Sequence, residues 1–143
     1  MMTTEIRKVT VAGAGTMGPG IAATFASHGY DTTLTDIQAD ALDMANSTVD
    51  MVYTVLVKEG FLTQNAAEAG RERLTTESNL DVALQGVDFL VESIPEKLDI
   101  KQAFYREIEP KVGAEVILAS NTSGFPITKL AEVTEFPGRV IGM

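Results

Sequence analysis

The sequence of 143 residues contains no cysteine and no tryptophan, and His28 is its single histidine. Without cysteine the chain forms no disulfide bond and no cysteine-ligated metal site, which agrees with the cytoplasmic location that we expect. Long apolar runs are also missing, because none approaches the ~20 residues of a membrane-spanning helix. The first residues lack the apolar stretch of a secretory signal. We therefore expect no metal site and no membrane partner.

Positive charge is scarce in this sequence. Lysine and arginine total 11 residues against 20 aspartates and glutamates, which gives a formal net charge of −9. A nucleic-acid backbone needs a basic stripe on the protein that binds it, so we expect no nucleic-acid partner. The length is that of one domain, which buries roughly two-thirds of the surface of the unfolded chain.

Strand-like and helix-like segments alternate along the chain, which is typical of a parallel sheet covered by helices. The pattern predicts strands at 8–12, 31–35, 74–76, 88–93, 116–119 and 139–143, and helices at 16–27, 38–59, 65–73, 96–109 and 127–133. These elements fit an α/β fold with a Rossmann-type, doubly wound and mainly parallel sheet in the order 3-2-1-4-5-6. Two helices between the second and third strands exceed a minimal unit, so we expect an inserted helical hairpin there.

Three glycines separate the first predicted strand from the first predicted helix, in the spacing Gly13-x-Gly15-x-x-Gly18. This spacing alone is weak evidence, but between a strand and a helix it is the dinucleotide-binding fingerprint. Gly13 permits the tight turn, Gly15 lets the backbone approach a pyrophosphate, and Gly18 allows close helix packing. The phosphates would then meet free N–H groups at the helix N-terminus.

Asp36 follows the second predicted strand, 18 residues after the last glycine of the motif. Its carboxylate is placed to accept hydrogen bonds from the ribose hydroxyls of the adenosine. The same carboxylate would repel the extra phosphate of NADP, and residues 37–40 supply no arginine to bind that phosphate. We therefore predict NAD as the cofactor.

Two further polar segments follow the fourth and fifth strands, at 92–96 and 120–123. Ligands bind outside the carboxyl ends of the strands in open α/β sheets, so both segments are candidates for a site. Each also has a structural explanation, because Ser, Thr and Asn satisfy loop backbones and Ser93-x-x-Glu96 has the spacing of a capping box. His28 is expected at the surface end of the first helix. No residue is then an obvious base for the hydroxyl proton.

Five segments together resemble the NAD-binding domain of the 3-hydroxyacyl-CoA dehydrogenases, especially the short-chain 3-hydroxybutyryl-CoA type. These segments are GAGTMGPGIA, Asp36, FLVESIPEKLDIK, ILASNTSGFPI and the final RVIGM. The resemblance covers essentially the whole chain. It implies an oxidoreductase that interconverts 3-hydroxyacyl-CoA and 3-oxoacyl-CoA by hydride transfer, in fatty acid or butanoate metabolism. It favours a functional role for Ser123, which matches the serine that hydrogen-bonds the reacting oxygen of the substrate.

The resemblance also assigns cofactor contacts, with the glycine loop on the pyrophosphate and Glu96 and Lys101 near the nicotinamide ribose. The cofactor-binding residues that it implies are Gly13, Gly15, Thr16, Met17, Gly18, Asp36, Ile37, Glu96, Lys101 and Asn121.

In such enzymes a histidine follows the last strand and takes the hydroxyl proton, and a helical C-terminal domain closes the cleft and forms the homodimer. This chain ends at Met143, where that histidine would come next. We therefore expect residues 1–143 to be one NAD-binding domain that is nearly inactive alone, since a general base contributes ~10²–10⁴-fold.

The substrate is less settled than the cofactor. Fatty-acyl relatives carry basic residues for the coenzyme A phosphates on the helix after the second strand, whereas residues 40–59 here hold Asp40, Asp43, Asp50 and Glu59 against Lys58 alone. A short-chain acyl-CoA thioester is the first expectation. A free 3-hydroxy acid, as in the gulonate dehydrogenase and λ-crystallin branch, is one alternative, and a non-catalytic NAD-binding protein is another.

Overall fold

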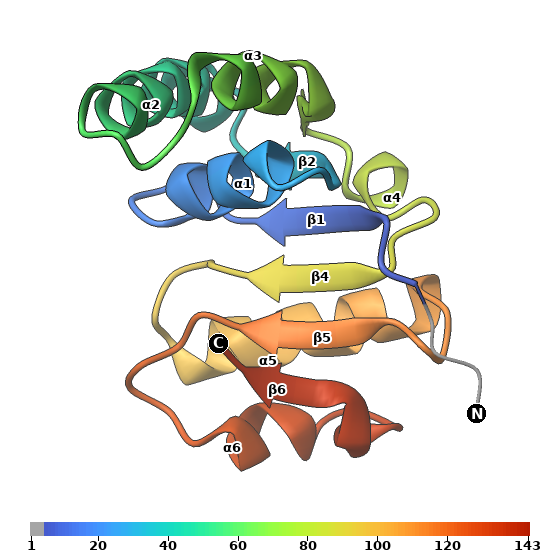
Figure 1. Cartoon of the computed structure of the whole chain (residues 1–143). Coiled ribbons are helices and arrows are strands. Elements are labelled where there is room, and N and C mark those ends of the chain that lie inside the picture. Colours follow the sequence, from blue (N-terminus) through green and yellow to red (C-terminus); the bar gives the residue numbers. More distant parts are fainter. Residues whose placement is uncertain (1–4) are drawn as a thin grey trace.

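The computed structural model describes residues 5–143 and contains a single six-stranded sheet in the order β3-β2-β1-β4-β5-β6 (Figure 1). Every neighbouring pair of strands is parallel. In chain order the elements are β1 (Lys8–Ala12), α1 (Gly18–Ser27), β2 (Asp31–Thr35), α2 (Ala39–Lys58), α3 (Gln64–Arg73), β3 (Leu74–Glu77), α4 (Leu80–Ala83), β4 (Phe89–Glu92), α5 (Leu98–Ile108), β5 (Ile117–Ser120), α6 (Ile127–Ala131) and β6 (Val140–Gly142), with short 3₁₀ turns at Glu109–Lys111 and Pro137–Arg139.

The strand order predicted from the sequence is therefore confirmed, and the sheet is wholly rather than mainly parallel. Two boundaries differ in ways that matter for the site. Helix α1 begins at Gly18 instead of Thr16, and α5 begins at Leu98 instead of Glu96. Both differences leave more loop at the carboxyl ends of β1 and β4. The short helix α4 was not predicted.

Helices cover opposite faces of the two halves of the sheet, as in a doubly wound fold. On the β1 half, Val9 and Val11 are fully buried with alanines of α1 in one core. On the β5 half, Leu118 is fully buried with Tyr105 and other apolar residues of α5 and α6 in a second core. The order of the strands reverses between β1 and β4. We call the carboxyl edge of the sheet at this point the crevice, because open α/β sheets bind their ligands there.

The expected helical hairpin is formed by α2 and α3, which pack together over α1 (Figure 1). The hydroxyl of Tyr53 on α2 donates to the carbonyl of Ala23 on α1 at 2.8 Å. A Cβ added to Gly70 on α3 would lie 2.9 Å from the backbone of Ser27. The hairpin is thus held against α1 by a hydrogen bond and by close backbone approach. Its connecting turn lies on the side to which the arrows of β1 and β4 point.

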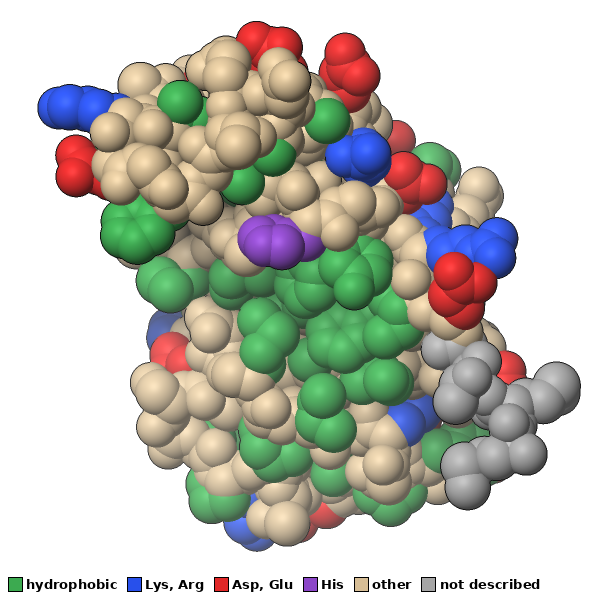
Figure 2. Space-filling view, in the orientation of Figure 1, with side chains coloured by type: hydrophobic (Ala, Val, Ile, Leu, Met, Phe, Trp, Pro, Cys, Tyr) green, Lys and Arg blue, Asp and Glu red, His purple; other side chains and the backbone are tan. Residues whose placement is uncertain are grey.

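Hydrophobic side chains gather over β1, β4 and β5 on the face seen in Figure 2, below the single histidine. Phe89 and Ile117 are paired in register on β4 and β5, and both are only partly buried. Ile141 on β6 points to the same face, because alternate residues of neighbouring strands share a side, and it is 40% exposed. Within residues 5–143, no helix has the length and apolar character needed to cross a membrane.

Candidate functional site

The glycine loop after β1 has the geometry that its sequence predicts. Gly13 has a φ of +107°, and a Cβ at that position would lie 2.2 Å from the carbonyl oxygen of Ser93. A Cβ on Gly18 would lie 1.7 Å from the carbonyl oxygen of Gly13. Side chains are therefore excluded at both positions by backbone atoms. Gly18 serves the packing of α1 against the loop itself, and its Cβ would also contact Leu34 of β2 at 3.5 Å.

Gly15 differs from the other two glycines of the motif. A Cβ there would find none of the described heavy atoms within 4 Å, and the residue is exposed together with Thr16 and Met17. The space above Gly15 is thus open at the N-terminus of the ten-residue helix α1. A phosphate fits this position, because free N–H groups and the helix dipole favour an anion.

Asp36 is joined to the glycine loop across the carboxyl ends of β1 and β2. Its Oδ2 accepts a hydrogen bond from the amide of Ala14 at 2.9 Å, and its Oδ1 accepts one from the amide of Gln38 at 2.9 Å. Each oxygen keeps a further lone pair for another donor. Ile37 beside it is 90% exposed. The predicted adenosine-binding residues therefore lie side by side with the predicted phosphate-binding loop.

The loops after β4 and β5 meet at the same edge of the sheet. The hydroxyl of Thr122 donates to Oε1 of Glu96, and the amide of Asn121 donates to the carbonyl of Glu92 at 2.9 Å. Ser123 follows directly and is exposed. The proposed capping box is wrong, because α5 starts at Leu98 and its N-cap, Lys97, makes no side-chain capping bond. The Glu96 carboxylate is thus bound to the opposite loop.

Lys101, for which the resemblance implies a contact near the nicotinamide ribose, is buried beside Glu96. Its side chain is 1% exposed, and its ammonium donates to Oε2 of Glu92 at 2.5 Å and to the carbonyl of Ile94 at 3.2 Å. The ammonium is 4.0 Å from Oε2 of Glu96, whose side chain is 44% exposed. Lys101 therefore stands behind Glu96, below the surface of the crevice.

Glu92 and Ser120 lie in the two candidate segments, 92–96 and 120–123, but the sequence assigned no role to either side chain. Both are fully buried, and the Ser120 hydroxyl donates to Oε1 of Glu92 at 2.8 Å. One signal was available, because Lys101 occupies the buried face of α5 together with Tyr105 and Ile108. A lysine on an inward helical face requires a buried anion.

Tyr105 lies close to this buried charge. Its hydroxyl is buried and has no hydrogen-bond partner among the residues that the structure describes. Burial and the nearby Glu92 carboxylate raise the pKa of Tyr105, so the phenol stays neutral at all physiological pH values.

His28 lies away from this edge, as predicted. It caps the end of α1, where its Nδ1 is 2.8 Å from the carbonyl oxygen of Thr24.

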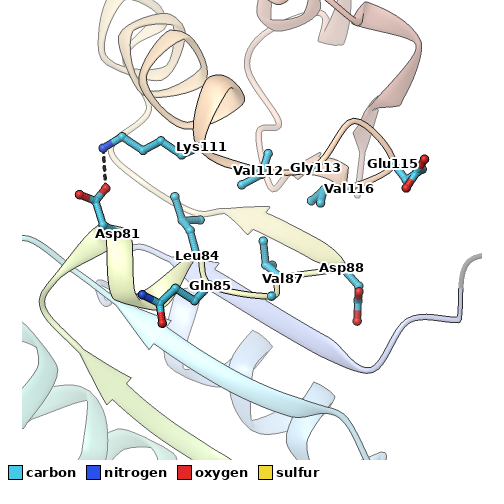
Figure 3. A pocket seen from close by; sticks show the side chains of 11 residues that line it. Asp81, Leu84, Gln85, Val87, Asp88, Lys111, Val112, Gly113, Glu115 and Val116 are labelled. Atoms are coloured by element: carbon cyan, nitrogen blue, oxygen red, sulfur yellow. Dashed lines mark hydrogen bonds and ion pairs between the residues drawn. The ribbon is translucent and has the colours of Figure 1, made fainter.

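A hollow of about 370 Å³ opens between α4 and the residues that precede β4 and β5 (Figure 3). Because these residues precede the strands, the hollow lies at the opposite edge of the sheet, and none of the predicted site residues lines it. In residues 5–143 no group of His, Asp and Glu side chains is arranged to hold a metal ion.

Comparison with known proteins identifies the family of this chain. Residues 8–143 match the family model described as "3-hydroxyacyl-CoA dehydrogenase, NAD binding domain". The chain belongs to this family. NAD is accordingly the cofactor of its domain, and the enzymes of the family are NAD-dependent oxidoreductases.

Members of the family that are named for different activities are similar to this chain. A 5-formyl-3-hydroxy-2-methylpyridine 4-carboxylate 5-dehydrogenase of Mesorhizobium japonicum is 38% identical, with 96% of this chain and 44% of the relative covered. A 3-hydroxybutyryl-CoA dehydrogenase of Bradyrhizobium diazoefficiens is 35% identical, with 99% and 48% covered. The crystal structure of a 3-hydroxybutyryl-CoA dehydrogenase from Ralstonia eutropha superposes with a TM-score of 0.89 at 37% identity, over 97% of this chain and 49% of that one. The chain thus spans less than half of these family members.

Proposed function

We propose that this chain is the NAD-binding domain of a dehydrogenase that interconverts 3-hydroxyacyl-CoA and 3-oxoacyl-CoA. The observation that carries the proposal is the single edge at which the glycine loop, Asp36 and the Asn121–Ser123 loop come together. The domain would comprise residues 1–143, and a further helical domain would close the cleft and form a homodimer. Fatty acid or butanoate metabolism is the setting that this substrate implies.

The shape of the site fits NAD. The open space at Gly15 admits a pyrophosphate, and the free lone pairs of Asp36 are available to ribose hydroxyls. Glu96 and Asn121, on the loops after β4 and β5, would hold the nicotinamide half, because these loops flank the strand-order reversal on its other side. Lys101 would support this half from below, through Glu96. When bound, NAD supplies the hydride acceptor.

Ser123 is the substrate-contacting residue in this proposal. Its hydroxyl is exposed at the edge of the crevice, and it would donate a hydrogen bond to the reacting oxygen of the substrate. This donor stabilises negative charge on that oxygen as the hydroxyl proton leaves. A general base is also needed, and we propose that it comes from outside residues 1–143, since His28 caps α1 far from the loop of Ser123.

A second candidate substrate is a free 3-hydroxy acid, and the charge on α2 favours it. Asp40, Asp43 and Asp50 lie on this helix, and Asp50 is paired with Arg71 of α3 at 2.8 Å. An acidic helix disfavours the phosphates of coenzyme A within about 10 Å, the distance over which salt screens charges. Relatives named for L-carnitine and for a pyridine carboxylate show that the family includes activities without CoA in their names.

A fluorescence titration of the 143-residue chain with NADH and NADPH tests the proposal. We expect saturable binding of NADH and at least tenfold weaker binding of NADPH, which corresponds to about 1.4 kcal/mol. Absence of NADH binding would contradict the assignment of a self-sufficient cofactor domain. Full-length protein assayed with 3-hydroxybutyryl-CoA and with free 3-hydroxybutyrate then separates the two substrates, and inactivity toward both supports a non-catalytic NAD-binding protein.

A further inference from the structure

A buried charged group connects the two loops that form the β4–β5 half of the crevice. Glu92 is the last residue of β4 and is fully buried. Its Oε2 accepts hydrogen bonds from the Lys101 ammonium at 2.5 Å and from the amide of Ile94 at 3.0 Å. Its Oε1 accepts one from the Ser120 hydroxyl at 2.8 Å. One carboxylate therefore binds α5, the loop after β4 and the end of β5.

Each of these bonds leads to a predicted site residue. Ile94 lies two positions before Glu96 in the same loop, and the Lys101 ammonium lies 4.0 Å from the Glu96 carboxylate. On the other side, the Ser120 hydroxyl accepts a bond from the amide of Thr122 at 3.2 Å, directly between Asn121 and Ser123. The backbone carbonyl of Glu92 also accepts from the Asn121 amide.

The buried ion pair between Glu92 and Lys101 is not explained by the stability that it adds to the fold. Burial of an ion pair costs desolvation energy that its mutual attraction does not reliably recover, so apolar residues at such positions are often as stable or more stable. A pair of this kind has its best explanation in the geometry that it enforces. Here the enforced geometry is the relative position of two loops, because both oxygens of one rigid group are used.

We infer that Glu92 is the positioning residue of the nicotinamide half of the site, where it holds the Glu96 loop and the Asn121–Ser123 loop in register. This inference rests on the proposed function. It distinguishes the two halves of the crevice, because the glycine loop and Asp36 make no bond to the Glu92 side chain among the described residues. Damage at Glu92 should therefore weaken binding of the nicotinamide half alone.

The test compares NADH with ADP as ligands of the Glu92→Gln variant. ADP carries only the adenosine and the pyrophosphate, which Asp36 and the glycine loop would hold. We expect the Kd for NADH to rise about tenfold, as the loss of a charged hydrogen bond predicts, and the Kd for ADP to stay within about twofold. An equal change in both constants, or no change in either, overturns the inference.

Glu109→Gln is the matched control. Glu109 accepts hydrogen bonds from the amides of Glu135 and Phe136 and pairs with Arg139 at 3.3 Å, and its side chain is 11% exposed. It lies beyond the C-terminus of α5, at the opposite edge of the sheet. This control should lose stability while the ratio of the NADH and ADP constants stays at the wild-type value.

Ser120→Ala provides a second variant that keeps the ion pair. It removes the Ser120 hydroxyl, and with it both the bond to Glu92 and the bond from the Thr122 amide, so the link from Glu92 to the β5 loop is lost. We expect a smaller rise in the Kd for NADH, about threefold, with ADP again unaffected. An unchanged ratio in Ser120→Ala overturns the inference even where Glu92→Gln does not fold. Failure of the wild-type chain to bind NADH at all overturns the proposed function instead, so the two failures are distinguishable.

Discussion

At the scale of single residues, two glycines of α1 have opposite surroundings. A Cβ on Gly18 would lie 1.7 Å from a backbone oxygen of the loop, whereas a Cβ on Gly20 would meet none of the described atoms within 4 Å. We expect Gly18→Ala to destabilise the chain by about 2–4 kcal/mol, since the backbone must move. Gly20→Ala should stabilise it by about 0.5–1 kcal/mol through helix propensity. Urea denaturation of both variants checks the pair, and equal effects would contradict this account.

Asp36 is the residue that selects the cofactor in our proposal. Asp36→Asn removes the charge and keeps one side-chain oxygen as an acceptor for the amide of Ala14 or of Gln38. We expect the preference for NADH over NADPH to fall by about tenfold, mainly through tighter NADPH binding, because repulsion of the extra phosphate is lost. Titration with both cofactors measures this preference. A preference that stays at the wild-type value would show that Asp36 is not the selecting residue.

The residues of the site were predictable from the sequence to different degrees. Gly13, Gly18 and Asp36 belong to a local motif, so the strand and helix on either side determine their geometry. The burial of Lys101 was not predictable in the same way, because it depends on Glu92 of a neighbouring element and on a helix start that shifted by two residues, from Glu96 to Leu98. A single sequence does not show which inward-facing side chains contact one another.

At the scale of elements, the N-terminal ends of β1 and β4 are joined by one aspartate. Asp88, just before β4, accepts hydrogen bonds from the amides of Arg7 and Lys8 at 2.8 Å each. These two backbone bonds, from Lys8 and Arg7, lower the pKa of the Asp88 carboxyl below its ordinary value of 3.8. A depressed folded-state pKa contributes stability above the unfolded value, and this contribution is lost as pH falls through the folded pKa.

We therefore expect Asp88→Asn to destabilise the chain by about 1 kcal/mol near pH 7. The difference from wild type should shrink as the pH falls below about 4, where the wild-type carboxyl of the unfolded chain is itself protonated. Chemical denaturation at several pH values measures both curves. A difference that is constant with pH would assign the effect to the shape of the side chain, not to its charge. Asp81→Asn, in an exposed pair with Lys111, is the control for loss of a surface carboxylate.

The sheet order was the most predictable feature at this scale, because alternating strands and helices leave few permitted topologies. Short elements were harder to predict from the sequence. Helix α4 spans only Leu80–Ala83 and has too few residues for a periodic pattern, although Asn79 caps it by accepting from the amide of Val82 at 3.2 Å. The end of the last helix was also overextended, since α6 stops at Ala131 and not at residue 133.

At the scale of the whole molecule, the net charge of −9 opposes the approach of an anionic cofactor. Residues 13–18 of the glycine loop contain no lysine or arginine to offset it. Raising the salt from about 20 mM to about 200 mM shortens the screening length from about 20 Å to about 7 Å, which reduces this repulsion. We expect the affinity for NADH to rise about twofold.

Fluorescence titrations at the two salt concentrations measure this change, with adenosine as an uncharged ligand whose affinity should not respond. A fall in NADH affinity with salt would mean that local attraction at the N-terminus of α1 outweighs the field of the whole molecule.

The sign of the net charge was predictable from the amino-acid composition. The clustering of apolar residues over β4 and β5 was not, because it depends on which face the helices leave open (Figure 2).

The strand order also governs how the chain assembles while it is being synthesised. Strand β2 lies between β1 and β3, and all three strands are complete by Glu77, together with the helices that cover them. The partner of β1 on its other side is β4, and the bond from Lys8 to Asp88 spans 80 residues. Half of the sheet is thus able to form on the ribosome before the other half has been translated. Formation of the long-range contact between β1 and β4 should then be the rate-limiting step of folding.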